Sequence, residues 1–459
     1  MNTDEVWLAQ QFGQACLGDA RRSRRAQKLA LGILQTPYKG LAAQTKTWGG
    51  CKAAYRLLHS QSVQHSHLLQ PHCQQTRQDA ADLPVALFIQ DTTELDFTSM
   101  TQAQGYGPIG DHRGQGLFVH TLLCLNPEDE QLLGVAAQRC WARHHDGSYK
   151  HTETRAQRYR RKDKESDVWH QVLADVGPVP QGRRWVSIGD RGSDSFVYWA
   201  KAREMGWQCL SRIFLNPRTN KQDYLVNLAC SLAPQAQLSL HQRARPAQAQ
   251  RTLELQLAWQ AVEIQPARND PNQSKMEPLQ ATVLRCWDEV HEVHEVHEVH
   301  EVQWLLLATW PINDEAQARQ CVQWYAQRWR IEEFHKCLKS GCRMESSQLK
   351  QADATQALLA FCSVAAARLL ELGRLARAQP QVLAKEHIDA LYVQVLSLQR
   401  GLKAETLTMV DYWREVAKLG GFLGRKHDKA PGWQTLWRGQ TKLDDLVSGY
   451  LLAIRPQCG

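Results

Sequence analysis

Apolar and polar positions follow successive patterns along the chain. Residues 1–75 contain polar segments with apolar positions at helical spacing, which predicts short helices. Compact apolar runs bounded by turn residues come next and are typical of buried strands. These runs occupy residues 84–89, 116–125, 132–141, 184–188 and 207–213. Helical stretches at 152–176 and 194–205 separate the later runs, so we expect an α/β fold in which helices cover a mixed sheet.

The alternation of helix and strand breaks down between residues 216 and 303. Polar and apolar residues alternate there, as in 252–257, and Pro and Asn mark turns, which predicts a mostly β insertion. The insertion ends in a Glu-Val-His repeat that starts at Glu289. A period of three puts the histidines on alternating faces of a strand, and on a helix they drift by ~60° per repeat. An exposed low-complexity repeat is therefore favoured over a metal site.

The last part of the chain has a helical pattern. We expect one long helix over 314–341, followed by further helices at 353–378, 387–400, 410–419 and 433–454. The predicted organisation is a helical N-terminal domain, an α/β domain that contains the insertion at about 216–303, and a helical C-terminal domain. These three domains occupy residues 1–75, 76–375 and 376–459.

Composition narrows the class of protein. The 459-residue chain is 43% hydrophobic and 22% charged, which excludes wholesale disorder. No apolar run approaches the ~20 residues of a membrane-spanning helix, and the N-terminus lacks the pattern of a secretory signal. The 13 cysteines are scattered, without a CxxC pair, so neither a disulfide framework nor a zinc site is indicated. We therefore expect a soluble cytoplasmic protein with no membrane partner.

Positive charge is concentrated near the N-terminus. Residues 1–75 carry a net charge of +6, most of the +8 of the whole chain. Arg21, Arg22 and Arg25 lie at the predicted start of a helix, where cations can bind phosphates and displace the counterions of DNA. A solvated helix face is the alternative interpretation of this basic run.

A second charged cluster lies on the predicted helix over 314–341. At ~100° per residue, one carboxylate, three cations and a phenol share an arc of roughly 80°. They are Tyr325, Arg328, Glu332, Lys336 and Lys339. The alternative is an exposed helix stabilised by ion pairs four residues apart, each worth ~0.2–0.5 kcal/mol.

Two further carboxylates change the balance between these interpretations. Asp91 and Asp190 each follow directly on a short apolar strand, at the end of the strand where open α/β sheets place their sites. Three converging carboxylates repel one another unless divalent cations lie between them, and Mg²⁺ or Mn²⁺ suits such ligands. Two such ions can activate water or a 3′-hydroxyl at phosphorus. With Glu332, these residues predict phosphoryl transfer on a nucleic acid, although a lone aspartate after a strand is more often a turn residue.

The same residues resemble a known family. Tyr325, Arg328, Glu332 and Lys339 match the Y-x2-R-x3-E-x6-K signature of the DDE transposases of the insertion-sequence four family. Three segments look like the motifs around the family's catalytic acids, namely IQDTT at 89–93, SIGDR at 187–191 and WRIEEFHK at 329–336. The resemblance extends over nearly the whole chain and implies an RNase H-like catalytic core between a DNA-binding N-terminal domain and a dimerisation domain at the C-terminus.

The resemblance also implies roles for individual residues. Asp91, Asp190 and Glu332 would bind Mg²⁺, for which Mn²⁺ can substitute. Tyr325, Arg328 and Lys339 would contact the phosphates of the transposon end. Arg212 matches an arginine that helps to hold a DNA hairpin, and Trp304 matches a tryptophan that stacks on a flipped base.

The activity that the resemblance implies is cut-and-paste transposition. Water cleaves one strand at the end of the element, the 3′-hydroxyl forms a hairpin, and the reopened ends join target DNA. The partners would be double-stranded DNA and, in the synaptic complex, a second copy of the chain. The alternatives are a decayed regulator that binds ends without cleaving them, and an RNase H-like nuclease without strand transfer.

Overall fold

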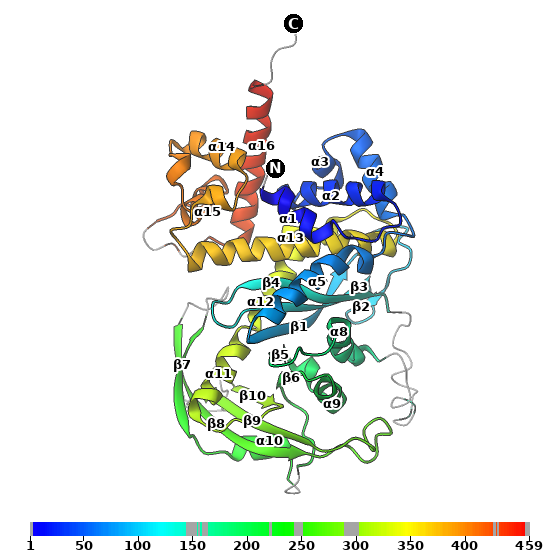
Figure 1. Cartoon of the computed structure of the whole chain (residues 1–459), viewed down its shortest axis with the longest axis vertical. Helices are drawn as coiled ribbons and strands as arrows, with labels where there is room; N and C mark the ends of the chain where they lie inside the picture. The colour runs from blue at the N-terminus through cyan, green and yellow to red at the C-terminus, as the bar shows by residue number, and fades with distance from the viewer. Residues whose placement is uncertain are drawn as a thin grey trace.

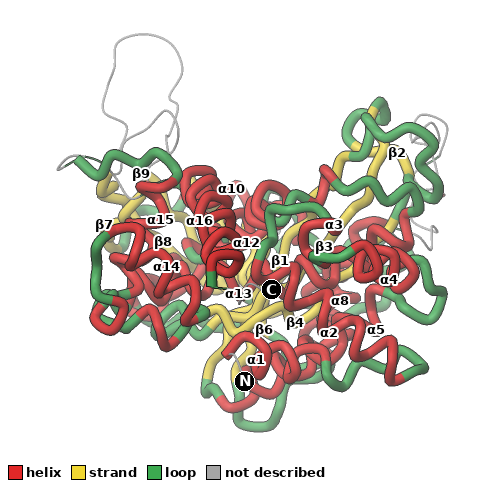
Figure 2. Tube along the Cα trace, turned by 90° about the horizontal axis from the view of Figure 1, so that it is seen from above, coloured by secondary structure: helices red, strands yellow, loops and turns green. Residues whose placement is uncertain are grey.

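A computed structural model describes residues 3–143, 154, 157, 164–219, 223–242, 251–288, 303–425, 428 and 431–454. The Glu-Val-His repeat lies outside these ranges. Helices pack on both faces of one large twisted sheet (Figure 1). Seen from above, the helices within residues 20–58 (α2–α4) and 390–453 (α14–α16) lie on opposite sides of α12 (Trp329–Lys336) (Figure 2). Both groups pack on the long helix α13 (Ala352–Ala378), which runs beneath them in Figure 1. No helix in the described ranges has both the length and the apolar character needed to cross a membrane.

The first part of the sheet confirms the predicted RNase H-like core. β1 (Val85–Asp96) pairs antiparallel with β3 (Gly114–Leu125), which in turn pairs antiparallel with β4 (Leu132–Trp141). On its other side, β1 pairs in parallel with β5 (Arg184–Gly189), and β5 pairs in parallel with β6 (Gln208–Arg212). A short strand, β2 (Gly107–Ile109), borders β3. The mixed sheet of the prediction is therefore present.

The predicted β insertion extends this same sheet. β10 (Gln303–Ala308) pairs antiparallel with β6, and β9 (Leu279–Asp288), β8 (Arg251–Ile264) and β7 (Ala236–Gln242) follow outward in that order. All these pairings are antiparallel. One short helix, α10 (Leu225–Ser231), also belongs to this region.

The alternation of side chains along the central strands builds two cores. Leu87 and Ile89 of β1 face a cluster formed with α5 (His65–Asp82), α12 and α13. Phe88, between them, faces the opposite cluster with α8 (Val168–Val176) and α9 (Phe196–Glu204). Successive strand residues point to opposite faces, so these fully buried strands contain unbroken apolar runs.

The N-terminal and C-terminal parts of the chain each form a group of helices beside the sheet. The N-terminal group contains α1 (Thr3–Phe12), α2 (Ala20–Gln35), α3 (Leu41–Thr45) and α4 (Trp48–Leu58), and it shares a core with α5 and α13. The C-terminal group contains α14 (Ala390–Arg400), α15 (Met409–Leu419) and α16 (Trp433–Ala453), with a smaller core of its own. α5 and α13 cross the predicted boundaries near residues 75 and 375, and the division into domains stays a prediction.

The long helix predicted over 314–341 is not continuous. α11 (Glu315–Ala326) ends in a tight turn, in which the Arg328 amide donates to the Tyr325 carbonyl at 3.0 Å. After α12, the helix widens into a π-helical turn, Cys337–Gly341, where the Cys342 amide donates to the Cys337 carbonyl at 2.8 Å. Because both irregular turns change the helical phase, the assumption of 100° per residue was wrong over this stretch.

Candidate active site

Strand pairing brings Asp91 and Asp190 together. In the parallel pair of β1 and β5, Ile89 lies opposite Ile188. Asp91 lies two residues further along β1, and Asp190 directly follows the last residue of β5 with its backbone still extended. Residues two apart on a strand share a face, so both aspartates lie on the face that α12 covers. Asp91 accepts a hydrogen bond from the Thr92 amide at 2.7 Å, and Asp190 accepts one from the Gly192 amide at 2.7 Å. The expected position at the end of a strand holds for Asp190, but it was wrong for Asp91, because β1 continues past this residue to Asp96.

Helix α12 carries Glu332 to the same place. Its buried residues Ile331 and Phe334 pack against the apolar face of the sheet. Arg328 joins the two parts of the site, because its guanidinium lies 3.7 Å from Asp91 Oδ2 and 2.5 Å from Glu332 Oε1. Arg328 thus bridges two of the three predicted carboxylates, and the third, Asp190, lies close enough to Asp91 to act on its charge.

The electrostatics of the site centre on Asp91. Burial raises the pKa of Asp91 to about 7, and the nearby Asp190 carboxylate adds to this rise. The Thr92 amide and the Arg328 guanidinium partly offset the rise, whereas Glu332 adds to it. Carboxylates that lie close together and are poorly solvated favour the binding of a cation.

The three carboxylates have the right chemistry to bind a divalent cation, but their oxygens are not arranged around a common point. Within the described ranges, no three His, Cys, Asp or Glu side chains are gathered so that they could hold a metal ion as they stand. Arg328 provides the positive charge between Asp91 and Glu332 instead. Three carboxylates are hard oxygen ligands of the kind that Mg²⁺ and Mn²⁺ prefer. The residues therefore fit such an ion once the guanidinium turns away.

An aromatic pair borders the carboxylates. The Tyr325 ring meets the Trp304 ring edge-on, with centroids 5.0 Å apart and an interplanar angle of 70°. Burial raises the pKa of Tyr325, while the neighbouring cations Arg328 and Arg212 oppose the rise. Trp304 is only half-buried, on β10, where its strand pairs with the strand of Arg212. Four of the residues assigned by resemblance are thus close neighbours.

The two lysines lie further along the catalytic helix. Lys339 is in the π-helical turn, with its Nζ 3.5 Å from Glu345 Oε1, and Glu345 also accepts a hydrogen bond from the Asp96 amide at 3.1 Å. Lys336 is exposed at the last residue of α12. The predicted single arc is therefore only partly formed, because Tyr325 is buried and the helix changes its pitch before Lys339.

The N-terminal arginines belong to a different surface. Arg21 is exposed at the start of α2, where Asp19 caps the helix and lies 3.2 Å from the guanidinium. Arg22 donates to the Leu17 carbonyl at 3.0 Å, and Arg25 lines a shallow depression between α2, α3 and α4. The helix that carries these residues, α2, lies among the N-terminal helices, apart from β5 and α12 (Figure 1).

A buried polar network supports the strands that carry the aspartates, and sequence analysis missed it. The Gln90 amide donates to Ser187 Oγ at 2.7 Å and to the Tyr198 hydroxyl at 3.0 Å, and its oxygen lies 2.8 Å from His120 Nε2. His120 Nδ1 lies 2.7 Å from Thr92 Oγ1. Burial lowers the pKa of His120 to about 3, so the ring is neutral. A glutamine and a histidine inside otherwise apolar strands were the available signal.

Two segments of the chain match known protein families. Residues 151–370 match the family described as Transposase DDE domain, and residues 4–63 match the family described as Transposase DNA-binding. Two separate segments of the chain are therefore similar to transposase domains, one to a DDE domain and one to a DNA-binding domain. Asp190 and Glu332 lie inside the first match, whereas Asp91 precedes it.

A solved structure is also similar to this chain. It is the cryo-electron microscopy structure of the piggyBac transposase synaptic complex with hairpin DNA. The alignment covers 100% of this chain and 87% of that chain, at 10% identity and a TM-score of 0.40. This likeness is too distant to support an argument about activity. The narrower resemblance stays a prediction. It is to the insertion-sequence four family and, within that family, to the transposase of transposon five.

Proposed function

We propose that the protein is a cut-and-paste DNA transposase, which binds the terminal inverted repeats of its element, cleaves them through a hairpin and joins the 3′-ends to target DNA. One observation carries this proposal: Asp91, Asp190 and Glu332 converge on one face of an RNase H-like sheet. The match of residues 4–63 to a transposase DNA-binding family supports DNA as the substrate.

Each carboxylate has a role in this proposal. Asp91, Asp190 and Glu332 would hold Mg²⁺, or Mn²⁺ in its place. When bound, such ions lower the pKa of the attacking water or 3′-hydroxyl and stabilise the leaving oxygen. Arg328 keeps Asp91 and Glu332 at short distance before loading, and it then becomes available to a DNA phosphate.

The residues around the carboxylates bind and orient DNA. Lys336 is exposed and Lys339 lies beside Glu345, so both can bind phosphates along the same helix. Tyr325 supports Arg328 from its buried position. These groups would hold the scissile phosphate against the carboxylates.

Trp304 and Arg212 belong to the hairpin step. A sharply bent hairpin must unstack a base, and stacking on an aromatic face is worth ~1–3 kcal/mol per base. Trp304 is half-buried, and its ring is held by Tyr325 on one side. Arg212, on the neighbouring strand, can bind the phosphate beside the displaced base.

The decisive experiment separates end binding from cleavage. We expect Glu332→Gln to bind the terminal repeats like the unchanged protein and to lose Mg²⁺-dependent cleavage. Exposed Glu405 offers a matched control, and Glu405→Gln should cleave normally. Binding without cleavage by the unchanged protein would indicate a decayed regulator, and cleavage without joining would indicate a nuclease that lacks strand transfer.

A further inference from the structure

The helix that carries Glu332 is short and is interrupted on both sides. α12 is only eight residues long, between the tight turn at Arg328 and the π-helical turn after Lys336. Both turns replace the regular hydrogen bonds between residues four apart that couple one helical turn to the next. The placement of Glu332 therefore depends on contacts that α12 makes with the rest of the core.

Apolar packing alone does not fix the rotation of α12. Ile331 and Phe334 anchor the helix against the sheet, but hydrophobic contacts have no preferred direction. Arg330 and Glu332 are separated by about 200° around the helix and so point to opposite sides. A rotation of about 20° would move a carboxylate that lies ~5–6 Å from the axis by roughly 2 Å.

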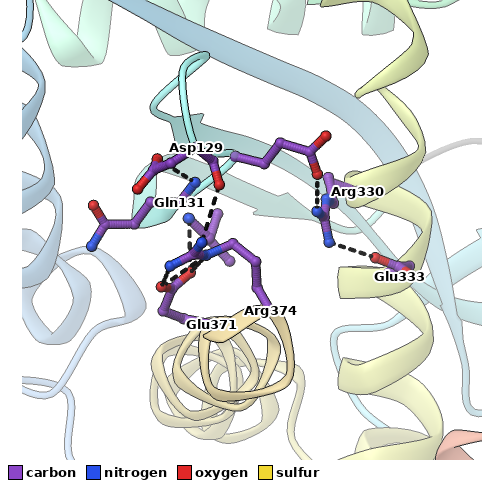
Figure 3. Close-up of polar contacts among 8 residues, drawn as sticks. Asp129, Gln131, Arg330, Glu333, Glu371 and Arg374 are labelled. Carbon is purple, nitrogen blue, oxygen red and sulfur yellow. Dashed lines mark hydrogen bonds and ion pairs between the residues drawn. The ribbon is translucent and has the colours of Figure 1, made fainter. Parts of the chain in front are cut away.

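Arg330 makes the directional contact. Its guanidinium pairs with Glu130 in the turn between β3 and β4, and it lies 3.4 Å from Glu333 Oε2 on its own helix. The Arg330 side chain is only 12% exposed, so its charge depends on these partners. Figure 3 shows Arg330 reaching from α12 toward the turn, with Glu333 beside it.

The turn that contains Glu130 is itself braced by α13. Arg374 donates to the Asp129 carbonyl at 3.0 Å, and Glu371 accepts a hydrogen bond from the Leu132 amide at 2.9 Å (Figure 3). Glu130 has a left-handed backbone, with φ of 58°, which is costly for a residue with a side chain. The turn is therefore a fixed point and not a loose loop.

We infer that the ion pair between Arg330 and Glu130 positions α12 so that Glu332 faces Asp91. Arg330 is in this sense a positioning residue, since it touches neither Asp91 nor Asp190 in the contacts described above. The effect of this ion pair on catalysis rests on the proposed function. The immobilisation of α12 by the ion pair is independent of the proposed function.

The first test follows hydrogen exchange and needs no activity. Arg330→Gln and Glu130→Gln should each speed amide exchange in residues 329–336, with little change in α11 or α13. Arg400→Gln is the control, because it removes another arginine–glutamate ion pair, 2.6 Å to Glu415, within the C-terminal helices. Unchanged exchange in both variants would overturn the inference.

The second test follows cleavage and metal dependence. Supporting residues of this kind typically change metal affinity or activity by roughly 10- to 100-fold. We expect Arg330→Gln to cleave that much more slowly and to need more Mn²⁺, with end binding unchanged. Arg330→Lys, which keeps the charge, should recover much of the loss. A general loss of folding would instead lower binding and cleavage together and would not change the Mn²⁺ requirement.

The two variants keep the outcomes separable. If Arg330→Gln fails to fold, Glu130→Gln carries the test, because Glu130 is 45% exposed and Arg330 still has Glu333. Normal exchange and normal cleavage in Glu130→Gln would then contradict the inference. If the unchanged protein cleaves no DNA but exchange in α12 responds, the proposed function fails and the positioning role stands.

Discussion

The strands and the helix that meet at the carboxylate site are held in place by different interactions. Asp91 lies on β1 and Asp190 directly follows β5, and the backbone ladder of these paired strands is supported by the fully buried Gln90 network. Glu332 lies on a short helix, which is oriented by ion pairs at its surface. The comparison indicates that the site has a rigid half, formed by the strands with Asp91 and Asp190, and an adjustable half, formed by α12 with Glu332. The adjustable half is the one that must change when Arg328 leaves the carboxylates.

Removing a carboxylate from the rigid half should have the largest effect. Asp190→Asn keeps an oxygen that can accept from the Gly192 amide but removes the charge, so the fold should persist. We expect cleavage to fall by about 10³-fold or more, measured as single-turnover nicking of an end duplex. Asp111→Asn, at an exposed aspartate, is the control. A loss smaller than tenfold would show that Asp190 is no ligand.

Disrupting the support of the rigid half should destabilise the whole protein. Gln90→Met would remove the hydrogen bonds of Gln90 to Ser187, Tyr198 and His120, each worth roughly 0.5–1.5 kcal/mol. The Tyr198 hydroxyl would still donate to Ser187 Oγ, and His120 would keep Thr92. We expect the free energy of unfolding to fall by about 3 kcal/mol in urea titrations. Gln61→Met, at an exposed position, should have no measurable effect. This contrasts with Arg330→Gln, for which we expect a local change in α12.

The raised pKa of Asp91 predicts a pH effect of defined sign. The pKa is about 7 in the folded protein against 3.8 ordinarily, so the folded state binds the proton more tightly. The contribution of Asp91 to stability without metal is therefore present below pH 4 and is lost as the pH rises toward 7. Asp91→Asn should raise the melting temperature at pH 8. An unchanged or lower value would contradict this assignment.

The smallest expected effects concern the N-terminal arginines, which lie outside both halves of the site. Arg21→Ala, Arg22→Ala and Arg25→Ala should each weaken end binding and lower its salt slope by about 1 if the residue contacts a phosphate. Cleavage of saturated complexes should stay normal. Exposed Arg113, paired with Asp111, offers a control substitution. An unchanged slope for all three would remove them from the DNA interface.

Much of the fold could be predicted from the sequence, because strands buried on both faces leave unbroken apolar runs. The position of Asp190 could be predicted because it directly follows such a run. Asp91 was expected at a strand end as well, but β1 continues to Asp96, because Gln90 and the polar residues after it remain in the backbone ladder with β3. The break at Arg328 and the π-helical turn could not, since a pattern of side chains does not record which carbonyl accepts a hydrogen bond. The pairing of Arg330 with Glu130 was equally hidden, because it joins residues far apart in the chain.

The most direct measurement is a crystal structure of the protein bound to a transposon end and soaked with Mn²⁺, with the ion located by anomalous scattering. We predict an Mn²⁺ ion bound by oxygens of Asp91, Asp190 and Glu332, with Arg328 turned away toward a DNA phosphate. An ion bound elsewhere, or none at saturating Mn²⁺ with Arg328 still between Asp91 and Glu332, would contradict the account.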